Sequence, residues 1–260
     1  KKASIVIVNK IQKNLNIRRQ IKVKNTLKFL TEVSKIFRGN INSKIIAITG
    51  SCGKTTLKEL LGNSLSKTCK VSISPKSYNN KYGVPLSLLN LDLKDDYGVL
   101  EVGMDKKGEI DYLTKIVRPD ISVITNINYA HAKNFNNIRQ IALAKSEIIK
   151  NTKANGFIVL NADDKFFKLH KKMAYDNNIN VISFGIKSNK SDIKFLGIKR
   201  KEKLFALNVL IKNIKRYFLI SNEFQSNIYN ILATLAVMSI DFDINKIKEN
   251  IFLNFKNPEG

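Results

Sequence analysis

The sequence has 260 residues, of which 43% are hydrophobic, so it can bury the core of one large domain or two small ones and is not a disordered chain. A net charge of +24 favours nucleic acid or an anionic membrane surface as partners, but the lysines are spread along the chain without a basic block or interleaved arginine and aromatic residues. We therefore interpret the charge as a solvated, lysine-rich surface that helps to attract anionic nucleotides, and we expect no nucleic-acid partner.

The first 41 residues carry a short run of elements. Their pattern predicts strands at 4–8 and 21–23 and a helix at 26–37 with one apolar face. These elements cannot close a core alone. We interpret residues 1–41 as the remnant of an N-terminal domain followed by a linker helix.

The segment 45–184 alternates between strand and helix patterns. Strands are predicted at 45–49, 71–73, 98–102, 121–125, 157–160 and 181–184. Helices are predicted at 54–66, 83–91, 109–116, 138–150 and 164–176. Such alternation indicates right-handed crossovers and a doubly wound parallel sheet.

The segment 192–220 changes character, because three apolar runs are separated by lysine-rich turns. It predicts antiparallel strands, and helices are predicted after it at 226–240 and 244–252. The expected fold class is therefore α/β: a doubly wound, mostly parallel sheet that carries a phosphate-binding loop (P-loop), with a small antiparallel β region appended.

The stretch 44–61, KIIAITGSCGKTTLKELL, places a glycine loop between a buried strand and a helix. Such a loop turns backbone N–H groups inward, and the helix adds its positive dipole end, so the pattern predicts a polyphosphate site. Counted from Gly50, the loop is shorter than G-x-x-x-x-G-K-[ST], and Thr49 extends it to T-G-S-C-G-K-T-T. Lys54 would neutralise the outer phosphates, and Thr55 would bind Mg²⁺. The predicted nucleotide-binding residues are Gly50, Ser51, Cys52, Gly53, Lys54, Thr55 and Thr56. The alternative is an ordinary strand-to-helix turn with an incidental lysine.

Further polar residues follow predicted strands, and the carboxyl ends of parallel strands share one edge of the sheet. Glu101, in G-V-L-E-V-G-M, can hold a Mg²⁺ between a nucleotide and a second reactant, or it can simply face solvent. His131, in T-N-I-N-Y-A-H, can be a second metal ligand or a structural histidine. Asn126, in the same loop, can bond a base edge or cap the turn.

Two cysteines form neither a disulfide framework nor a metal cluster, and no apolar run reaches the length of a membrane span. We therefore expect a cytoplasmic protein. Because the sequence begins without Met and stops in a loop-like stretch, we also expect a fragment whose C-terminal domain is missing beyond residue 260.

The chain resembles the central domain of the Mur ligases in an ordered series of motifs: TGSCGKTT, SYNNKYGVPLSLLNL, LEVGMDKKGEIDYLTKIVRPDISVITNINYAHAKNFNNIRQIALAKSEI and VLNADD. The resemblance covers roughly residues 42–257. The blocks N-N-x-x-G-V-P-L-S-L-L and E-V-G-M with G-E-I favour the subtype that joins D-alanyl-D-alanine to UDP-N-acetylmuramoyl-tripeptide. This resemblance implies a monomeric cytoplasmic ligase of peptidoglycan precursor synthesis that uses ATP and Mg²⁺ and forms an acyl phosphate.

The resemblance also implies roles for individual residues. The implied catalytic residues are Lys54, Lys145 and His131, and the implied metal ligands are Thr55, Glu101, His131 and Lys145, the last as a carbamoylated lysine. Asn126 and Asn230 match positions near the adenine, and Ser77, Asn79 and Asn80 match the loop that faces the muramoyl peptide. The family commonly has H-N-x-x-N near the adenine, whereas Ser226 replaces that histidine here, which puts one nucleotide contact in doubt.

Other functions remain open at this point. A sister Mur ligase or folylpolyglutamate synthase would share the ATP site and differ in the acceptor. A nucleotide-binding fragment without catalysis would keep the loop and release no ADP.

Overall fold

The computed structural model describes residues 3–129 and 134–255, and its main sheet holds nine strands within them. Six strands run parallel: β3 (Lys44–Thr49), β4 (Val71–Ile73), β5 (Tyr97–Glu101), β6 (Ile121–Ile124), β7 (Phe157–Asn161) and β8 (Asn180–Gly185). A seventh, β9 (Ile193–Lys201), pairs with β8 in parallel, and β10 (Leu204–Ile211) and β11 (Ile214–Ile220) continue the sheet through antiparallel pairings. The order across the sheet is β11-β10-β9-β8-β7-β6-β3-β5-β4, which confirms the predicted fold class.

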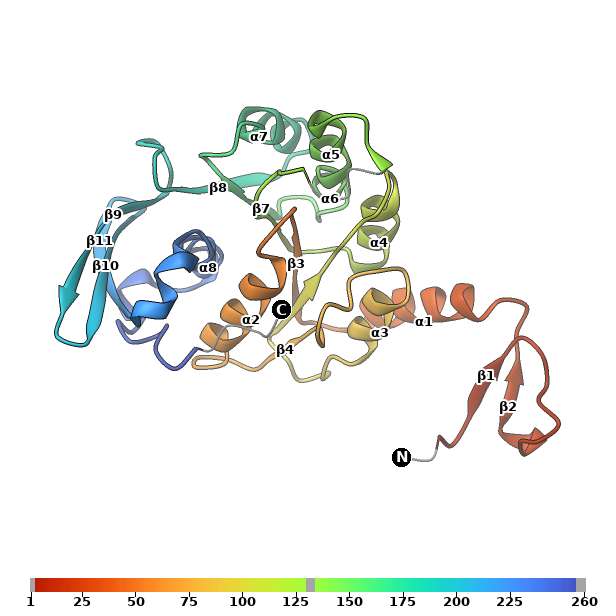
Figure 1. Cartoon of the computed structure of the whole chain (residues 1–260). Helices are drawn as coiled ribbons and strands as arrows, with labels where there is room; N and C mark the ends of the chain where they lie inside the picture. The colour runs from red at the N-terminus through yellow and green to blue at the C-terminus, as the bar shows by residue number, and fades with distance from the viewer. Residues whose placement is uncertain (1–2, 130–133, 256–260) are drawn as a thin grey trace.

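Helices cover both faces of this sheet (Figure 1). One face carries α2 (Lys54–Leu65) and α8 (Ile228–Asp241). The other carries α1 (Thr26–Asn40), α3 (Gly83–Leu89), α4 (Glu109–Val117), α5 (Ile138–Lys145), α6 (Glu147–Lys150) and α7 (Phe167–Asp176). Side chains of β3 alternate between the two cores, with Ile46 and Ile48 in one and Ile45 and Ala47 in the other. The apolar run that predicted a strand buried on both sides is thereby explained.

The sheet has its topological switch point at β3. From β3 the chain first passes to β4 and β5 on one side, and it then crosses to β6, β7 and β8 on the other. Loops that follow the strands diverge at such a point, which leaves a crevice at the carboxyl edge of the sheet. The glycine loop 50–53, which joins β3 to α2, lies at this edge.

The N-terminal elements form a separate unit. Strands β1 (Val6–Val8) and β2 (Gln20–Lys22) pair in parallel beside the main body, with η1 (Ile17–Arg19) before β2, and α1 joins them to β3 (Figure 1). Helix α1 packs on the central domain: Arg38 is 5% exposed and donates to the carbonyls of Val117 and Arg118 and to the carboxylate of Asp120. The assignment of residues 1–41 to a preceding domain stays a prediction.

The predicted helix at 244–252 is wrong, because only the short η4 (Ile244–Lys246) forms there. Arg216 of β11 donates to the carbonyls of Ile244 and Ile247, and the N–H of Leu219 donates to the carbonyl of Glu249. The sheet edge therefore takes the acceptors that a helix would need. The predicted helix at 226–240 also differs, because it begins as the 3₁₀ segment η3 (Asn222–Asn227) before α8.

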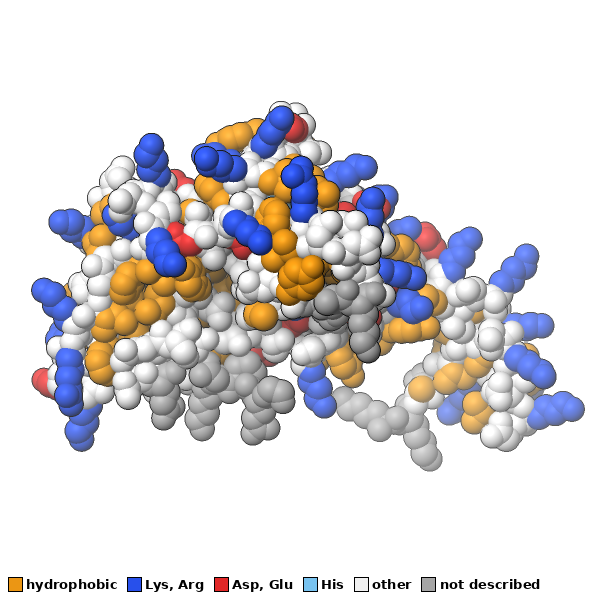
Figure 2. All heavy atoms as spheres, turned by 45° about the horizontal axis from the view of Figure 1, so that its top comes forward, with side chains coloured by type: hydrophobic (Ala, Val, Ile, Leu, Met, Phe, Trp, Pro, Cys, Tyr) orange, Lys and Arg blue, Asp and Glu red, His pale blue; other side chains and the backbone are white. Residues whose placement is uncertain are grey.

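The distribution of charged side chains on the surface agrees with the expectation that the positive charge is dispersed. Figure 2 shows, on the face that it draws, Lys and Arg side chains scattered over many elements, with Asp and Glu between them. Among the described residues, each helix is too short or too polar to cross a bilayer.

We expect Arg38→Leu to lower the free energy of unfolding by about 3 kcal/mol, because it removes a buried ion pair and leaves two carbonyls at the end of α4 without their donor. Urea denaturation followed by circular dichroism measures the change. Arg19→Leu, at an exposed position of η1, serves as the control and should change the free energy of unfolding by less than about 0.5 kcal/mol. Equal values for the two variants would contradict the role of Arg38.

Candidate active site

The loop 50–53 needs its two glycines. Gly50 has a φ of +147°, and a side chain there would run into the hydroxyl of Thr125. Gly53 has a φ of +80°, the left-handed conformation that L side chains rarely adopt, and it precedes α2 without a side-chain cap. The first turn of α2 therefore presents N–H groups that no side chain of the helix cap satisfies, as an anion site requires.

The loop after β6 fixes this backbone from behind. Asn126 accepts from the N–H of Cys52 at 3.1 Å and donates to its carbonyl at 3.0 Å. The Thr125 hydroxyl donates to the same carbonyl at 2.7 Å. The Ser51 hydroxyl donates to the carbonyl of Asn128 and accepts from its N–H, both at 2.9 Å. The glycine loop is thus preorganised by residues more than 70 positions away.

Two lysines converge on one acceptor of the loop. Lys54 and Lys145 both donate to the carbonyl of Gly50, at 3.0 Å and 2.9 Å. Lys145 is 1% exposed, and burial together with the nearby charge of Lys54 lowers its pKa to about 7. A single carbonyl cannot balance two ammonium groups, so the site favours a polyanion.

A carboxylate and two hydroxyls meet beside the loop. Glu101 is 2% exposed; one of its oxygens accepts from the Thr55 hydroxyl at 2.8 Å and the other from the Asn79 amide at 2.8 Å. The Ser77 hydroxyl lies 3.4 Å from that of Thr55. Thr55, Glu101, Ser77 and Asn79, all predicted as site residues, therefore lie together.

These oxygens fit Mg²⁺. Neighbouring ligands of an octahedral Mg²⁺ lie about 2.8–3.0 Å apart when each is about 2.0–2.1 Å from the metal. The separation of 2.8 Å between the Thr55 hydroxyl and the Glu101 carboxylate matches that spacing. Within the described part of the chain no three His, Cys, Asp or Glu side chains form a metal cluster, so phosphate oxygens and water are expected to complete the shell. The predicted ligand His131 lies outside the described residues.

A pocket of about 580 Å³ opens on the β5 side of the loop. Asn79, Asn80 and segment 103–109 line it, with Lys54 and Lys145 at its inner end. Asn80 also caps α3, since its carboxamide oxygen accepts from the N–H groups of Tyr82 and Gly83. Sequence reasoning missed the other lining side chains, including Lys81, Tyr82, Lys106, Lys107 and Tyr112. Their positions in the sequence were the available signal: Lys81 and Tyr82 follow the N-N block, Lys106 and Lys107 lie between E-V-G-M and G-E-I, and Tyr112 lies two residues after G-E-I.

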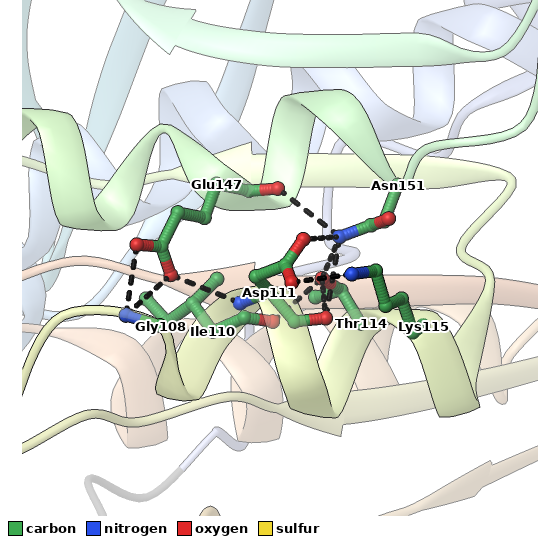
Figure 3. A network of polar contacts seen from close by, with 7 residues as sticks. All are labelled: Gly108, Ile110, Asp111, Thr114, Lys115, Glu147 and Asn151. Carbon is green, nitrogen blue, oxygen red and sulfur yellow. Dashed lines mark hydrogen bonds and ion pairs between the residues drawn. The ribbon is translucent and has the colours of Figure 1, made fainter.

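A polar network holds the wall of this pocket (Figure 3). The Glu147 carboxylate accepts from the N–H of Gly108 at 2.9 Å and from that of Asp111 at 3.0 Å, so it closes the N-terminus of α4. Asp111 in turn accepts from Lys115 at 2.6 Å and from Asn151 at 2.9 Å. The start of α4 is therefore a fixed wall whose N–H groups are taken by protein.

A second pocket, of about 280 Å³, opens on the other side of the loop. It brings together Asn126 and Asn230 with Asn161, Asp163 and Tyr229. Burial opposes ionisation of Asp163, but bonds from the N–H groups of residues 186–188 and from the Tyr229 hydroxyl outweigh it and lower the pKa of Asp163. Burial and this carboxylate raise the pKa of Tyr229 to about 12. Ser226, in place of the family histidine, is exposed in η3.

Comparison with known proteins identifies what the chain is similar to. The family model of the Mur ligase middle domain matches residues 48–238. A curated relative, the UDP-N-acetylmuramoyl-tripeptide–D-alanyl-D-alanine ligase of Buchnera aphidicola subsp. Baizongia pistaciae, is 35% identical over 240 residues, which are 88% of this chain and 49% of that protein. The chain thus spans about half the length of this relative.

Solved structures agree with the sequence relatives. MurF from Acinetobacter baumannii superposes with a TM-score of 0.85 at 28% identity and covers 98% of this chain and 55% of its own. The MurF ligase from Thermotoga maritima in complex with ADP gives a TM-score of 0.84 at 28% identity, with coverages of 99% and 58%.

We expect Asn126→Ala to accelerate hydrogen exchange of the Cys52 amide about fivefold, because a lost hydrogen bond is worth about 1 kcal/mol. Exchange is followed by NMR. Asn128→Ala is the matched control, since Asn128 contacts Ser51 through its backbone alone. An unchanged Cys52 amide in Asn126→Ala would show that the loop does not depend on this side chain.

Proposed function

The chain belongs to the Mur ligase family, and from this premise we propose that its protein uses ATP to join D-alanyl-D-alanine to UDP-N-acetylmuramoyl-tripeptide. The observation that carries the proposal is the meeting of the phosphate loop with Glu101 and the 77–80 block. A nucleotide held by Lys54 and α2 would there face a metal-binding carboxylate and a separate pocket. A simple nucleotide-binding module has no need of such a neighbour. Because the chain spans about half of its curated relatives, the activity is proposed for the whole protein.

The two pockets on either side of the loop suit two substrates. The smaller pocket, with its Asn side chains, offers amide donors and acceptors to an adenine and is adjacent to Gly53. The larger one carries Lys81, Lys106 and Lys107, whose charge suits the carboxylates of a muramoyl peptide. Phosphate transfer would take place between the pockets, next to Lys54.

The proposed reaction has two steps. The terminal carboxylate of the tripeptide attacks the γ-phosphorus of ATP, the bond to ADP breaks, and an acyl phosphate forms. The amine of D-alanyl-D-alanine then attacks the acyl carbon; the tetrahedral intermediate loses phosphate, and the nitrogen loses a proton to give the amide. Lys54 and the N–H groups of loop and helix bind the phosphates and stabilise charge on the transferred group.

Thr55 and Glu101 would hold Mg²⁺, which when bound neutralises charge on the phosphates. Asn79 keeps the Glu101 carboxylate oriented through its second oxygen. The protein therefore contributes alignment of the reactants and electrostatic stabilisation, with its acidic and basic groups fixed in advance.

We propose further that Lys145 is carbamoylated. Its amine is buried, its pKa of about 7 leaves a substantial neutral fraction at neutral pH, and it donates to the carbonyl of Gly50 and, among the described residues, to no carboxylate. The neutral amine adds to CO₂ with loss of a proton and becomes an anionic carbamate. That change would relieve the repulsion with Lys54 and add an oxygen ligand near the metal position.

The substrate assignment predicts phosphate release that requires both UDP-N-acetylmuramoyl-tripeptide and D-alanyl-D-alanine. In the full-length protein, Lys54→Ala should lower this rate roughly 100-fold or more, because a charge-stabilising group is lost. Lys35→Ala, at an exposed position of α1, is the control and should keep the wild-type rate.

Acceptor choice separates the related enzymes. Turnover with single amino acids and none with D-alanyl-D-alanine would indicate a sister ligase. ATP binding without acceptor-dependent phosphate release by the full-length wild type would contradict the proposed reaction.

Carbamoylation of Lys145 predicts a carbamate carbon signal after incubation with ¹³C-bicarbonate, measured by ¹³C NMR. Lys145→Arg should abolish it, because a guanidinium stays protonated and does not add CO₂. Lys150→Arg, at an exposed position of α6, should leave it unchanged. A signal that persists in Lys145→Arg would assign the carbamate elsewhere, and no signal in the wild type would exclude the modification.

A further inference from the structure

Lys58 is a fully buried cation to which the proposed reaction assigns no part. It lies in α2 one turn after Lys54 and is 0% exposed. Its ammonium donates to the carbonyl of Ser74 at 2.6 Å and to that of Lys76 at 2.5 Å, and it lies 3.0 Å from the carboxylate of Glu59. The three N–H bonds of the ammonium thus have three acceptors.

The segment 75–82, which Lys58 contacts through Lys76, is held by polar contacts and not by apolar burial. None of residues 75–82 is buried, so apolar packing contributes little to its position. Lys76 has a φ of +47°, a left-handed conformation that costs energy in a residue other than glycine. The bond from Lys58 to its carbonyl stabilises that conformation.

The same segment carries Ser77 and Asn79 into the site. Ser77 lies against Thr55, and Asn79 donates to Glu101. Thr55 and Lys58 are three residues apart on α2 and therefore share one face of the helix. The helix thus contacts the segment twice, through Thr55 beside the phosphates and through Lys58 one turn deeper.

We propose that Lys58 is a positioning residue that holds the substrate-facing block 77–80 against the phosphate-binding helix. The effect of Lys58 on catalysis rests on the proposed function. Its effect on the position of the segment rests on the contacts alone. Helix α2 does not need Lys58 for its own place, because Leu57, Leu60 and Leu61 anchor it in the core. Loss of the ammonium releases the 75–82 segment and leaves the helix and its phosphate site in position.

The test compares Lys58→Met with Lys67→Met in the full-length protein. Lys67 is the matched control, since it follows α2 and also donates to two carbonyls, of Ile251 and Leu253, far from the site. Lys58→Met should raise the KM for UDP-N-acetylmuramoyl-tripeptide about tenfold, as expected for about 1.4 kcal/mol of lost positioning. It should change the calorimetric Kd of ATP less than about twofold, because α2 keeps its place.

Hydrogen exchange provides a readout that does not need activity. Amides of residues 75–82 should exchange faster in Lys58→Met and at the wild-type rate in Lys67→Met. Lys58→Arg keeps a charged donor. It should therefore show slow exchange in residues 75–82 and a KM close to the wild-type value. If Lys58→Met does not fold, Lys58→Gln, which retains one amide donor group, is measured in the same way.

The role of Lys58 would be overturned if exchange in residues 75–82 were unchanged in Lys58→Met. It would also be overturned if the Kd of ATP and the KM for the tripeptide substrate rose by the same factor. An inactive wild type would overturn the proposed function instead, and the exchange rates would still decide whether Lys58 holds the segment.

Discussion

A single carbonyl oxygen, that of Gly50, accepts hydrogen bonds from both Lys54 and Lys145. Two ammonium groups in one buried place repel each other, and the fold must oppose this repulsion before any ligand arrives. It does so through the loop after β6, which pins the backbone of Cys52, and through the glycine conformations that turn the carbonyl inward. The stability of the domain thus sustains an excess of positive charge that an incoming polyphosphate would relieve.

Helix ends decide where that polyphosphate can bind. Three helices begin around the larger pocket, and each N-terminus exposes N–H groups that attract anions. The start of α4 is closed by Glu147, and that of α3 by Asn80. Helices α2 and α4 both have a glycine cap, Gly53 and Gly108, but in the described part of the chain no carboxylate closes the start of α2 as Glu147 closes that of α4. The protein satisfies the competing anion sites internally and leaves one, beside Lys54, for the ligand.

Much of this could be predicted from the sequence, since it depends on local patterns. The strand-helix alternation placed the parallel strands within one or two residues, and TGSCGKTT located the glycine loop between β3 and α2, because glycine and lysine spacing is a local signal. Residues that act through distant partners could not be predicted in this way. Lys58, Arg38 and Glu147 resemble surface charges in the sequence, and only the folded chain shows the carbonyl and N–H groups that they satisfy. The wrong prediction of a helix at 244–252 has the same cause, because Arg216 of the distant strand β11 binds the carbonyl oxygens of Ile244 and Ile247.

The appended strands β9 to β11 influence the candidate site through one helix, α8. Helix α8 packs in the core shared by β8 to β11. It places Asn230 where a side chain at Gly53 would meet it, and it places the Tyr229 hydroxyl 3.1 Å from the Asp163 carboxylate. Asp163 binds three successive N–H groups after β8, so the parallel sheet and α8 are tied at the smaller pocket. The appended β region therefore supports the helix that closes the proposed adenine side. Without it, the loop 50–53 would remain, but the pocket proposed to take the adenine would lose one wall.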